Sequence, residues 1–285
     1  MTQTALILGA TGRFGRHAAT AFETAGWAVR RFDRTKGDLN AEAAGADVIV
    51  NAWNPPYDKW ASQVPELHAR VRHAARTSGA TVILPGNVYV FGQNGQTVWS
   101  ETSPHLATNP LGRIRIDMEQ AYRRDGVKTI ILRAGDFVDT QLSGNWFDKV
   151  MTPKIRTGVL IYPGATDRAH AWAFLPDLAR AAVALADRRE ALPDFADIPF
   201  PGFTLTGQEL AQALGRVTGG TVRIKQMNWV PIQLARPFWP LAKHLLEMRY
   251  LWSQAHRLDG SGLSGLLPEF EMTAPDAALA QALPR

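Results

Sequence analysis

The chain contains no cysteine. Disulfide bonds, thiolate nucleophiles and thiolate zinc sites are therefore excluded, and the composition fits a reducing compartment. No apolar run approaches the roughly 20 residues that span a bilayer, and no signal peptide is recognisable, so we expect a cytoplasmic protein without stable membrane insertion. The 7 histidines show no metal-binding spacing such as His-x-x-x-His, which predicts that no metal is bound.

A strong excess of one charge sign is also missing. The formal net charge is +5, and basic pairs such as Arg123-Arg124 are scattered rather than gathered in a tract with aromatic residues. This pattern argues against nucleic-acid binding; solvated helix faces and a phosphate-bearing ligand explain the charge. Hydrophobic residues make up 46% of the 285 residues, enough to bury the core of a large α/β domain with a smaller lobe.

Three glycines follow the first apolar run. Gly9, Gly12 and Gly15 are spaced G-x-x-G-x-x-G, which is typical of the phosphate-binding turn of a nucleotide-binding βαβ unit. Gly9 would permit the sharp turn out of the strand, Gly12 would let the backbone approach a pyrophosphate, and Gly15 would let the helix pack closely on the strand. The helix would direct its free N–H groups and positive dipole end at the phosphates.

Short β-rich runs alternate with helical stretches up to about residue 138. Strands are expected at 5–8, 28–32, 48–52, 81–84 and 129–132, and helices at 16–25, 66–78 and 114–125. The alternation predicts an α/β fold with a doubly wound parallel sheet, a Rossmann fold. Its ligand crevice would lie at the carboxyl ends of the strands.

The pattern changes after about residue 135, where Gly, Pro and Trp become frequent. Helices at 175–186 and 207–217 and a strand at 221–225 are mixed there. We therefore expect residues 139–285 to form mostly a smaller α+β substrate lobe.

Segment 229–252 is rich in Trp, Phe, Leu and basic residues. An amphipathic helix at a membrane surface is one interpretation. Because Pro231, Pro237 and Pro240 interrupt the segment, we favour a lobe that packs its aromatic residues over a substrate pocket.

Several short segments recur in a familiar order along most of the chain. They are 9–15, 33, 37–39, 50–52, 86–89, 118–120, 132–137, 174–180 and 269–285. Together they resemble the extended and atypical branch of the short-chain dehydrogenase/reductase superfamily, which includes sugar-nucleotide epimerases, dehydratases and dehydrorhamnose reductases. The resemblance implies an NAD(P)-binding Rossmann core at 1–138, to which 165–186 returns.

The resemblance places the cofactor around the glycine turn and at the ends of the second and third strands. The implied cofactor-binding residues are Gly9, Thr11, Gly12, Arg13, Phe14, Gly15, Asp33, Arg34, Asp38, Leu39, Asn51, Ala52, Trp53 and Arg115. Asp33 would accept hydrogen bonds from the adenosine ribose and favour NAD. Arg13, Arg31 and Arg34 suit the 2′-phosphate of NADP. NADP or NAD therefore stays open, with a lean to NADP, and a simple turn at Asp33-Arg34 is the alternative.

The superfamily's catalytic Ser or Thr, Tyr and Lys are missing at the positions that the resemblance implies. Leu111 stands at the Tyr position and Arg115 at the Lys position. The hydroxyl position falls on Pro85, or on Gly86 or Asn87 if the loop is shifted, and none of these carries a hydroxyl. Leucine cannot exchange a proton, and arginine does not give up its own. The cofactor half of the site is thus retained without the standard proton-transfer half.

Other residues would have to complete the chemistry. Our catalytic candidates are Tyr89 as proton donor, Asn87 as hydrogen-bond donor to a substrate carbonyl, and Arg115 as a positive charge near the ribose. Packing is the alternative for Tyr89 and an Asx turn for Asn87. His105 is expected to be an ordinary loop histidine, and Asp136 is expected to brace the loop after the 129–132 strand.

Two functions remain open. The first is an NAD(P)-binding oxidoreductase or epimerase-like enzyme for a small carbonyl or sugar-nucleotide-like substrate. The alternative is a non-catalytic NAD(P)-binding sensor or interaction protein, whose occupancy alters partner binding. Helices 66–78 and 114–125 resemble those of the family's four-helix dimer interface, so a homodimer is a further expectation.

Overall fold

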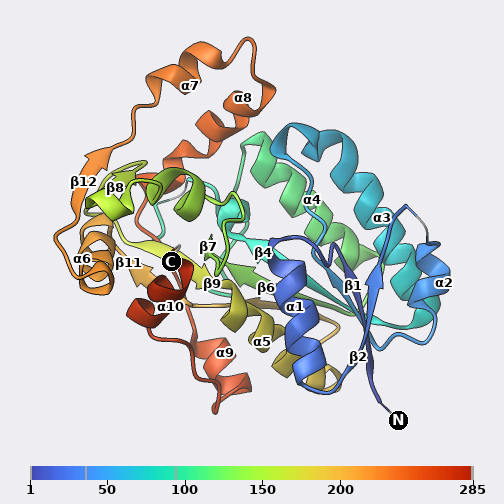
Figure 1. Cartoon of the computed structure of the whole chain (residues 1–285). Helices are drawn as coiled ribbons and strands as arrows, with labels where there is room; N and C mark the ends of the chain where they lie inside the picture. The colour runs from blue at the N-terminus through green and yellow to red at the C-terminus, as the bar shows by residue number, and fades with distance from the viewer. Residues whose placement is uncertain (1, 36, 94, 284–285) are drawn as a thin grey trace.

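A parallel sheet runs through the centre of the molecule in this computed structural model, which describes residues 2–35, 37–93 and 95–283 (Figure 1). Its strands are β1 (Thr4–Leu8), β2 (Ala28–Phe32), β3 (Val48–Asn51), β4 (Thr81–Asn87), β6 (Thr129–Ala134) and β10 (Phe195–Pro199). Within the described ranges the sheet has six strands in the order β10-β6-β4-β3-β1-β2. Every neighbouring pair is parallel, which confirms the doubly wound fold class.

Helices cover both faces of this sheet (Figure 1). Alternate residues of β1 belong to different buried clusters, Leu6 to one and Ile7 to the other, because successive side chains of a strand point to opposite faces. The covering helices are α3 (Trp60–Ser78) and α4 (Pro110–Arg124) on the Leu6 face, and α1 (Arg13–Thr24) and α5 (Leu175–Asp187) on the Ile7 face. Because helices exclude water from both faces of the sheet, the strands can carry apolar side chains on both sides.

Three helices begin earlier than the sequence analysis expected. α1 begins at Arg13, because Gly12 of the glycine turn is itself the N-cap. α4 begins at Pro110, a first helical position where the missing N–H has no partner to lose. α3 begins at Trp60 and carries Pro65 inside the helix, so the expected start after that proline was wrong.

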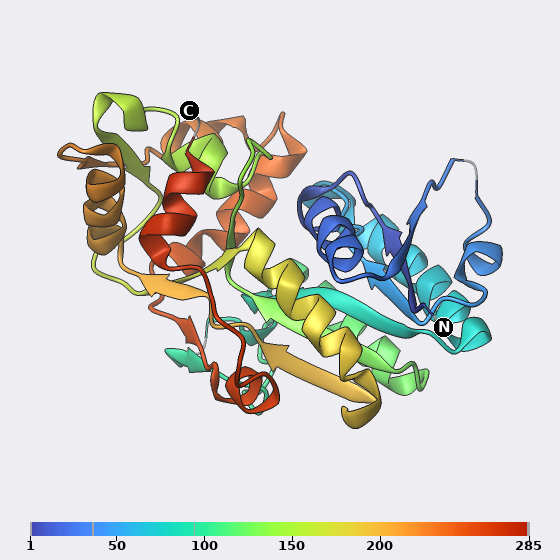
Figure 2. The same cartoon turned by 60° about the horizontal axis from the view of Figure 1, so that its bottom comes forward.

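The second lobe is built from smaller sheets. Its strands are β7 (Asp136–Val138), β8 (Val159–Tyr162), β9 (His170–Phe174), β11 (Phe203–Leu205) and β12 (Arg223–Gln226). The order β11-β9-β7 forms a mixed sheet, and β12 pairs with β8. Trp172, Trp229 and Trp252 lie in its core. In Figure 2 the helices α6 (Gly207–Thr218) and α10 (Pro275–Ala282) of this lobe lie far from the N-terminal strands.

Two elements of the second half of the chain return to the core. The return of α5 was expected, and α5 packs against α1. The return of β10 was not expected, because Asp197 and Pro199 interrupt its apolar pattern. A smaller pairing joins β5 (Val98–Trp99) to β13 (Arg257–Leu258), so the chain crosses between core and lobe several times.

Gly15 lies where α1 crosses the turn that follows β1. A Cβ at Gly15 would come within 2.1 Å of the Gly9 carbonyl oxygen. We expect Gly15→Ala to lower the free energy of unfolding by about 1–3 kcal/mol in urea denaturation, because α1 must move off the turn. Gly265→Ala is the control, since a Cβ in α9 (Ser261–Leu266) would meet open space and alanine favours a helix. Equal stabilities of the two variants would contradict the close crossing.

Candidate functional site

The turn after β1 meets the end of β3 at the carboxyl edge of the sheet. The chain leaves β1 for β2 on one side and continues to β3 on the other, so these strand ends flank the crevice where doubly wound folds bind ligands. Gly9 has a φ of +75°, a conformation that favours glycine. A Cβ on Gly9 would lie 3.1 Å from Trp53 Cδ1 and 3.2 Å from the Ala52 carbonyl oxygen. Predicted residues from two strand ends are therefore in contact.

The N-terminus of α1 offers backbone donors beside this crevice. Gly12 is the N-cap, and within the described part of the chain its helix has no side-chain cap. The Gly12 N–H donates to the Gly9 carbonyl oxygen at 2.8 Å, which closes the turn. Thr11 is exposed and Phe14 is buried under the helix. The first-turn N–H groups and the helix dipole thus form a site suited to an anion.

Two of the arginines that suit NADP have protein partners. Arg13 donates from Nε to the Ser143 carbonyl oxygen at 2.8 Å and from Nη2 to the Gly144 carbonyl oxygen at 2.7 Å. Arg31 pairs with Glu23 at 2.7 Å on the surface. Arg13 therefore ties the glycine turn to the second lobe, and neither contact favours a 2′-phosphate.

The residues after β2 form short turns. Asp33 Oδ1 accepts hydrogen bonds from the Thr35 N–H at 2.9 Å and the Thr35 hydroxyl at 2.7 Å, as the turn alternative predicts, and Arg34 is exposed. Asp38 caps α2 (Leu39–Ala43) by accepting from the Asn40 N–H at 3.0 Å. Leu39, the first residue of α2, is buried, so local side chains hold the turn between β2 and α2.

Asn51 is buried at the end of β3. Its Oδ1 accepts from the Trp53 N–H at 3.2 Å, and its Nδ2 lies 3.4 Å from His68 Nδ1, which is 2.9 Å from the Tyr122 hydroxyl. Burial lowers the pKa of His68 well below its ordinary value, and nearby arginines lower it further. A neutral network therefore shapes the 51–53 turn.

Tyr89 follows β4 in the short helix η2 (Val88–Phe91) and meets a second tyrosine. Its hydroxyl lies 2.5 Å from the Tyr57 hydroxyl. Asn87 Oδ1 accepts from the Tyr89 N–H at 3.1 Å, so Asn87 does make the Asx turn. Burial raises the pKa of both phenols, and the charge of Asp136 raises each further, whereas their mutual hydrogen bond lowers that of Tyr57. Both tyrosines therefore stay protonated at neutral pH.

Arg115 is buried between α4 and the end of β4. Its Nη2 donates to the Pro85 carbonyl oxygen at 3.1 Å, and its guanidinium lies 5.5 Å from the Trp60 ring centroid. Its buried Nε meets no hydrogen-bond partner among the described residues. Leu111, one turn earlier, is fully buried, and its N–H donates to Glu247 at 2.7 Å. The cation thus lies toward the carboxyl end of β4, and the leucine belongs to the core.

A carboxylate–histidine pair completes the candidate site. Asp136 Oδ2 lies 2.7 Å from His170 Nε2, and the imidazole stacks on Trp252 with ring centroids 4.3 Å apart. The Asp136 side chain keeps 24% of its surface exposed, and its charge acts on Tyr57 and Tyr89. Asp136 was expected only to brace its loop, and His170 could not be identified from the sequence, because no local spacing links β7 to β9.

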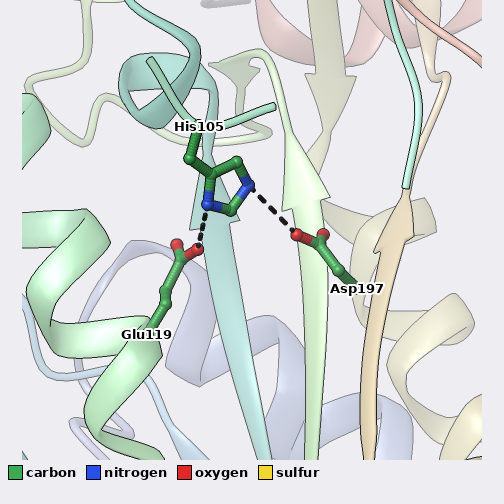
Figure 3. A group of neighbouring side chains, drawn as sticks. All are labelled: His105, Glu119 and Asp197. Atoms are coloured by element: carbon green, nitrogen blue, oxygen red, sulfur yellow. Dashed lines mark ion pairs between the residues drawn. The ribbon is translucent and has the colours of Figure 1, made fainter. Parts of the chain in front are cut away.

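Figure 3 shows a second histidine between two carboxylates. His105 Nδ1 lies 3.8 Å from Glu119 Oε2, and His105 Nε2 lies 3.5 Å from Asp197 Oδ2. These three residues could supply metal ligands. However, Arg133 Nη2 already contacts the same two carboxylate oxygens at 2.8 and 2.5 Å, and its Nη1 donates to the Asn87 carbonyl oxygen. We interpret the cluster as a structural brace in which Arg133 pairs with both carboxylates. His105 lies in a loop, as expected, and adds contacts to the same two carboxylates.

Asp139 fastens the start of α1 to the second lobe through Arg16 and His17. Burial would raise the pKa of Asp139, but hydrogen bonds from His17, Ser143 and Arg16 lower it from 3.8 to about 2. Because the folded-state pKa is depressed, the stabilisation is present above the unfolded pKa and is lost as the pH falls toward the folded pKa. Its size is roughly 2 kcal/mol.

We therefore expect Asp139→Asn to be less stable than the wild type by about that amount at neutral pH. The difference should shrink between about pH 5 and pH 2, as followed by urea unfolding at each pH. Asp167→Asn is the control, because its carboxylate is 62% exposed. A stability difference for Asp139→Asn that does not change with pH would contradict the assigned pairing.

No protein-family model and no curated protein matches the sequence. Solved structures match in fold: MoeE5 in complex with UDP-glucose and NAD has a TM-score of 0.75 and 15% identity, with 98% of this chain and 97% of that chain covered. The UDP-glucose 4-epimerase from Brucella ovis in complex with NAD has a TM-score of 0.72 and 16% identity, with 99% of this chain and 97% of that chain covered. The UDP-glucuronic acid 4-epimerase from Bacillus cereus in complex with NAD has a TM-score of 0.73 and 13% identity, with 98% of this chain and 95% of that chain covered. The chain therefore shares the Rossmann-type fold of sugar-nucleotide epimerases over nearly its whole length.

Proposed function

We propose that the protein is an NAD(P)-binding oxidoreductase or epimerase-like enzyme for a small carbonyl or sugar-nucleotide-like substrate. The observation that carries the proposal is the glycine turn, where Gly9 has a left-handed backbone and Gly15 has no room for a Cβ. Such a turn before an uncapped helix N-terminus suits a pyrophosphate. The solved structures of similar fold that contain NAD support the same assignment.

The residues of this crevice suit the two ends of a dinucleotide. The pyrophosphate would be held by the first turn of α1, and the adenosine end would lie toward Asp33 and Asp38. The nicotinamide end would lie toward Asn51 and Asn87. Because Arg13 and Arg31 have protein partners, the contacts favour NAD over NADP.

The bound cofactor would exchange a hydride with a substrate carbon, and the protein would have to move the proton. Tyr89 is neutral and can donate its proton to a carbonyl oxygen, while the Tyr57 hydroxyl can replace that proton through their hydrogen bond. Asp136, held by His170, would return a proton taken up from solvent to the Tyr57–Tyr89 pair after this step, and would accept the proton along the same path when the reaction runs in reverse. The Asn87 amide nitrogen can donate to the carbonyl, and Arg115 supplies a positive charge.

Gly12→Asp tests the cofactor site directly. The Gly12 backbone, with φ −77° and ψ 175°, lies in a region open to any residue, and aspartate is a favourable N-cap. A Cβ would lie 3.1 Å from the Gly9 carbonyl oxygen, so the variant should fold after a small shift of the turn. Its carboxylate would repel the pyrophosphate, and we expect the affinity for NADH in a fluorescence titration to fall about 100-fold. Gly12→Asn is the control of equal size without the charge. It measures how much affinity is lost because a side chain lies between the backbone and the pyrophosphate, and its loss should be smaller than that of Gly12→Asp. No binding of NADH or NADPH by the wild type would overturn the proposal.

Tyr89→Phe and Asp136→Asn test the proton transfer. Each should reduce kcat by about 100-fold to 10,000-fold and leave the NADH affinity unchanged, because only a proton-transfer group is removed. The measurement is NADH oxidation with a panel of aldehydes, ketones and nucleotide sugars. Asp167→Asn, which changes an exposed carboxylate, should retain full activity. Full activity in Tyr89→Phe would exclude the tyrosine as the acid.

A non-catalytic sensor is the second candidate. It is favoured by Leu111, which is fully buried at the implied position of the catalytic tyrosine. Tight NADH binding without turnover of any compound in the panel would support it. Hydride transfer that is lost in Tyr89→Phe or Asp136→Asn would exclude it.

A further inference from the structure

An exposed apolar tip projects from the second lobe. It belongs to the hairpin formed by α7 (Val230–Ala235) and α8 (Pro240–Glu247), which lies at the top of the molecule in Figure 1. Its large exposed side chains are Val230 at 52%, Leu234 at 72%, Phe238 at 89% and Trp239 at 41%. Val230 and Leu234 share one face of α7, because residues four apart lie on the same side of a helix.

The hairpin is anchored at both ends, so its exposure is not that of a loose tail. Trp229, before α7, is buried and donates from Nε1 to the Pro163 carbonyl oxygen at 2.7 Å. Glu247, at the end of α8, accepts from Asn109 Nδ2 at 2.8 Å and from the Leu111 N–H at 2.7 Å. The chain therefore presents the tip on a fixed base.

Exposed basic residues accompany the apolar tip: Arg236 and Lys243 belong to the hairpin itself. The basic residues of this part of the chain are Arg223, Lys225, Arg236, Lys243 and Arg249. Between 223 and 249 the sequence has a single acidic residue, Glu247, and its carboxylate points inward to α4. The exposed charges of this segment are thus basic.

We propose that the α7–α8 hairpin docks on the surface of an anionic lipid bilayer. Phe238, Trp239 and Leu234 would enter the boundary between headgroups and acyl chains, and Arg236 and Lys243 would contact lipid phosphates. None of the described helices is long and apolar enough to cross a membrane, so the contact is peripheral. A second copy fits less well, because a stable dimer interface buries about 800 Å² on each partner and a projecting tip is narrow.

The docking surface lies next to the candidate site. α8 packs against η1 (Tyr57–Lys59), which carries the tyrosine that is hydrogen-bonded to Tyr89. A docked bilayer would therefore lie close to the crevice. The proposal does not rest on the proposed function, because it concerns only the outer face of the hairpin.

Co-sedimentation of the full chain with vesicles tests the docking surface. We expect binding to phosphatidylcholine vesicles that contain phosphatidylglycerol, little binding to phosphatidylcholine alone, and weaker binding at high salt. Leu234→Ser with Phe238→Ser, and separately Arg236→Glu with Lys243→Glu, should each weaken binding about tenfold or more. Leu142→Ser is the matched control, because Leu142 is also 72% exposed but lies outside the hairpin.

Circular dichroism and thermal unfolding should show that all these variants fold, since the changed side chains are exposed. Absence of binding to the anionic vesicles at low salt would overturn the proposal, as would binding that the Leu234→Ser, Phe238→Ser variant retains. Light scattering tests whether a second copy of the chain, rather than a bilayer, occupies the tip. A wild-type dimer that this variant converts to a monomer would show that the tip joins two copies and would also overturn it.

Discussion

A single buried guanidinium connects the parts of this fold that carry the candidate chemistry. Arg133 is fully buried on β6, and it contacts Glu119 of α4, Asp197 of β10 and the carbonyl of Asn87 at the end of β4. The two carboxylates raise the pKa of Arg133 although burial alone would lower it. Because an unpaired charge at this depth would be strongly destabilising, these four segments have to keep their relative positions. The loop with Asn87 and Tyr89 is held by this constraint.

The protonation of the tyrosines follows from burial rather than from the nearby cation. The charge of Arg115 lowers the pKa of Tyr57, but desolvation has the larger, opposite effect. A cation at this position therefore does not produce a phenolate here. Within the described residues, the charge of Asp136 raises the pKa of both phenols, which supports the proposed role of the Asp136–His170 pair as proton acceptor.

The sequence predicted the parts of the molecule that depend on local patterns. The glycine turn, the apolar strands and the change after residue 135 all reflect local periodicity and turn chemistry, and the fold class was correct for that reason. The boundaries were less accurate where a proline lies inside or at the start of a helix, as Pro65 and Pro110 do. The contact of the glycine turn with the 52–53 turn follows from the parallel sheet, so it could be anticipated.

The remaining features depend on tertiary contacts that no spacing encodes. His170 lies on a different strand from Asp136, which it contacts. His105 contacts Asp197, which lies on β10, the strand that was not expected in the sheet. Arg13 suits a phosphate by its position in the turn, yet it binds two carbonyls of a distant loop. An arginine side chain can bind phosphates, carboxylates or backbone carbonyls. Which of them lies within reach depends on the tertiary structure.

The return of β10 has a consequence for the order of folding. Until Phe195–Pro199 leaves the ribosome, one edge of β6 has no strand beside it and Arg133 lacks Asp197. An unpaired strand edge exposes free N–H and C=O groups and is prone to wrong pairing. Pairing between strands so far apart in sequence is also slow, because the loop must close before the contact forms. Completion of the candidate site is thus a late event in synthesis, and a chain truncated before residue 195 would leave Arg133, which holds the Asn87 loop, without its contact to Asp197.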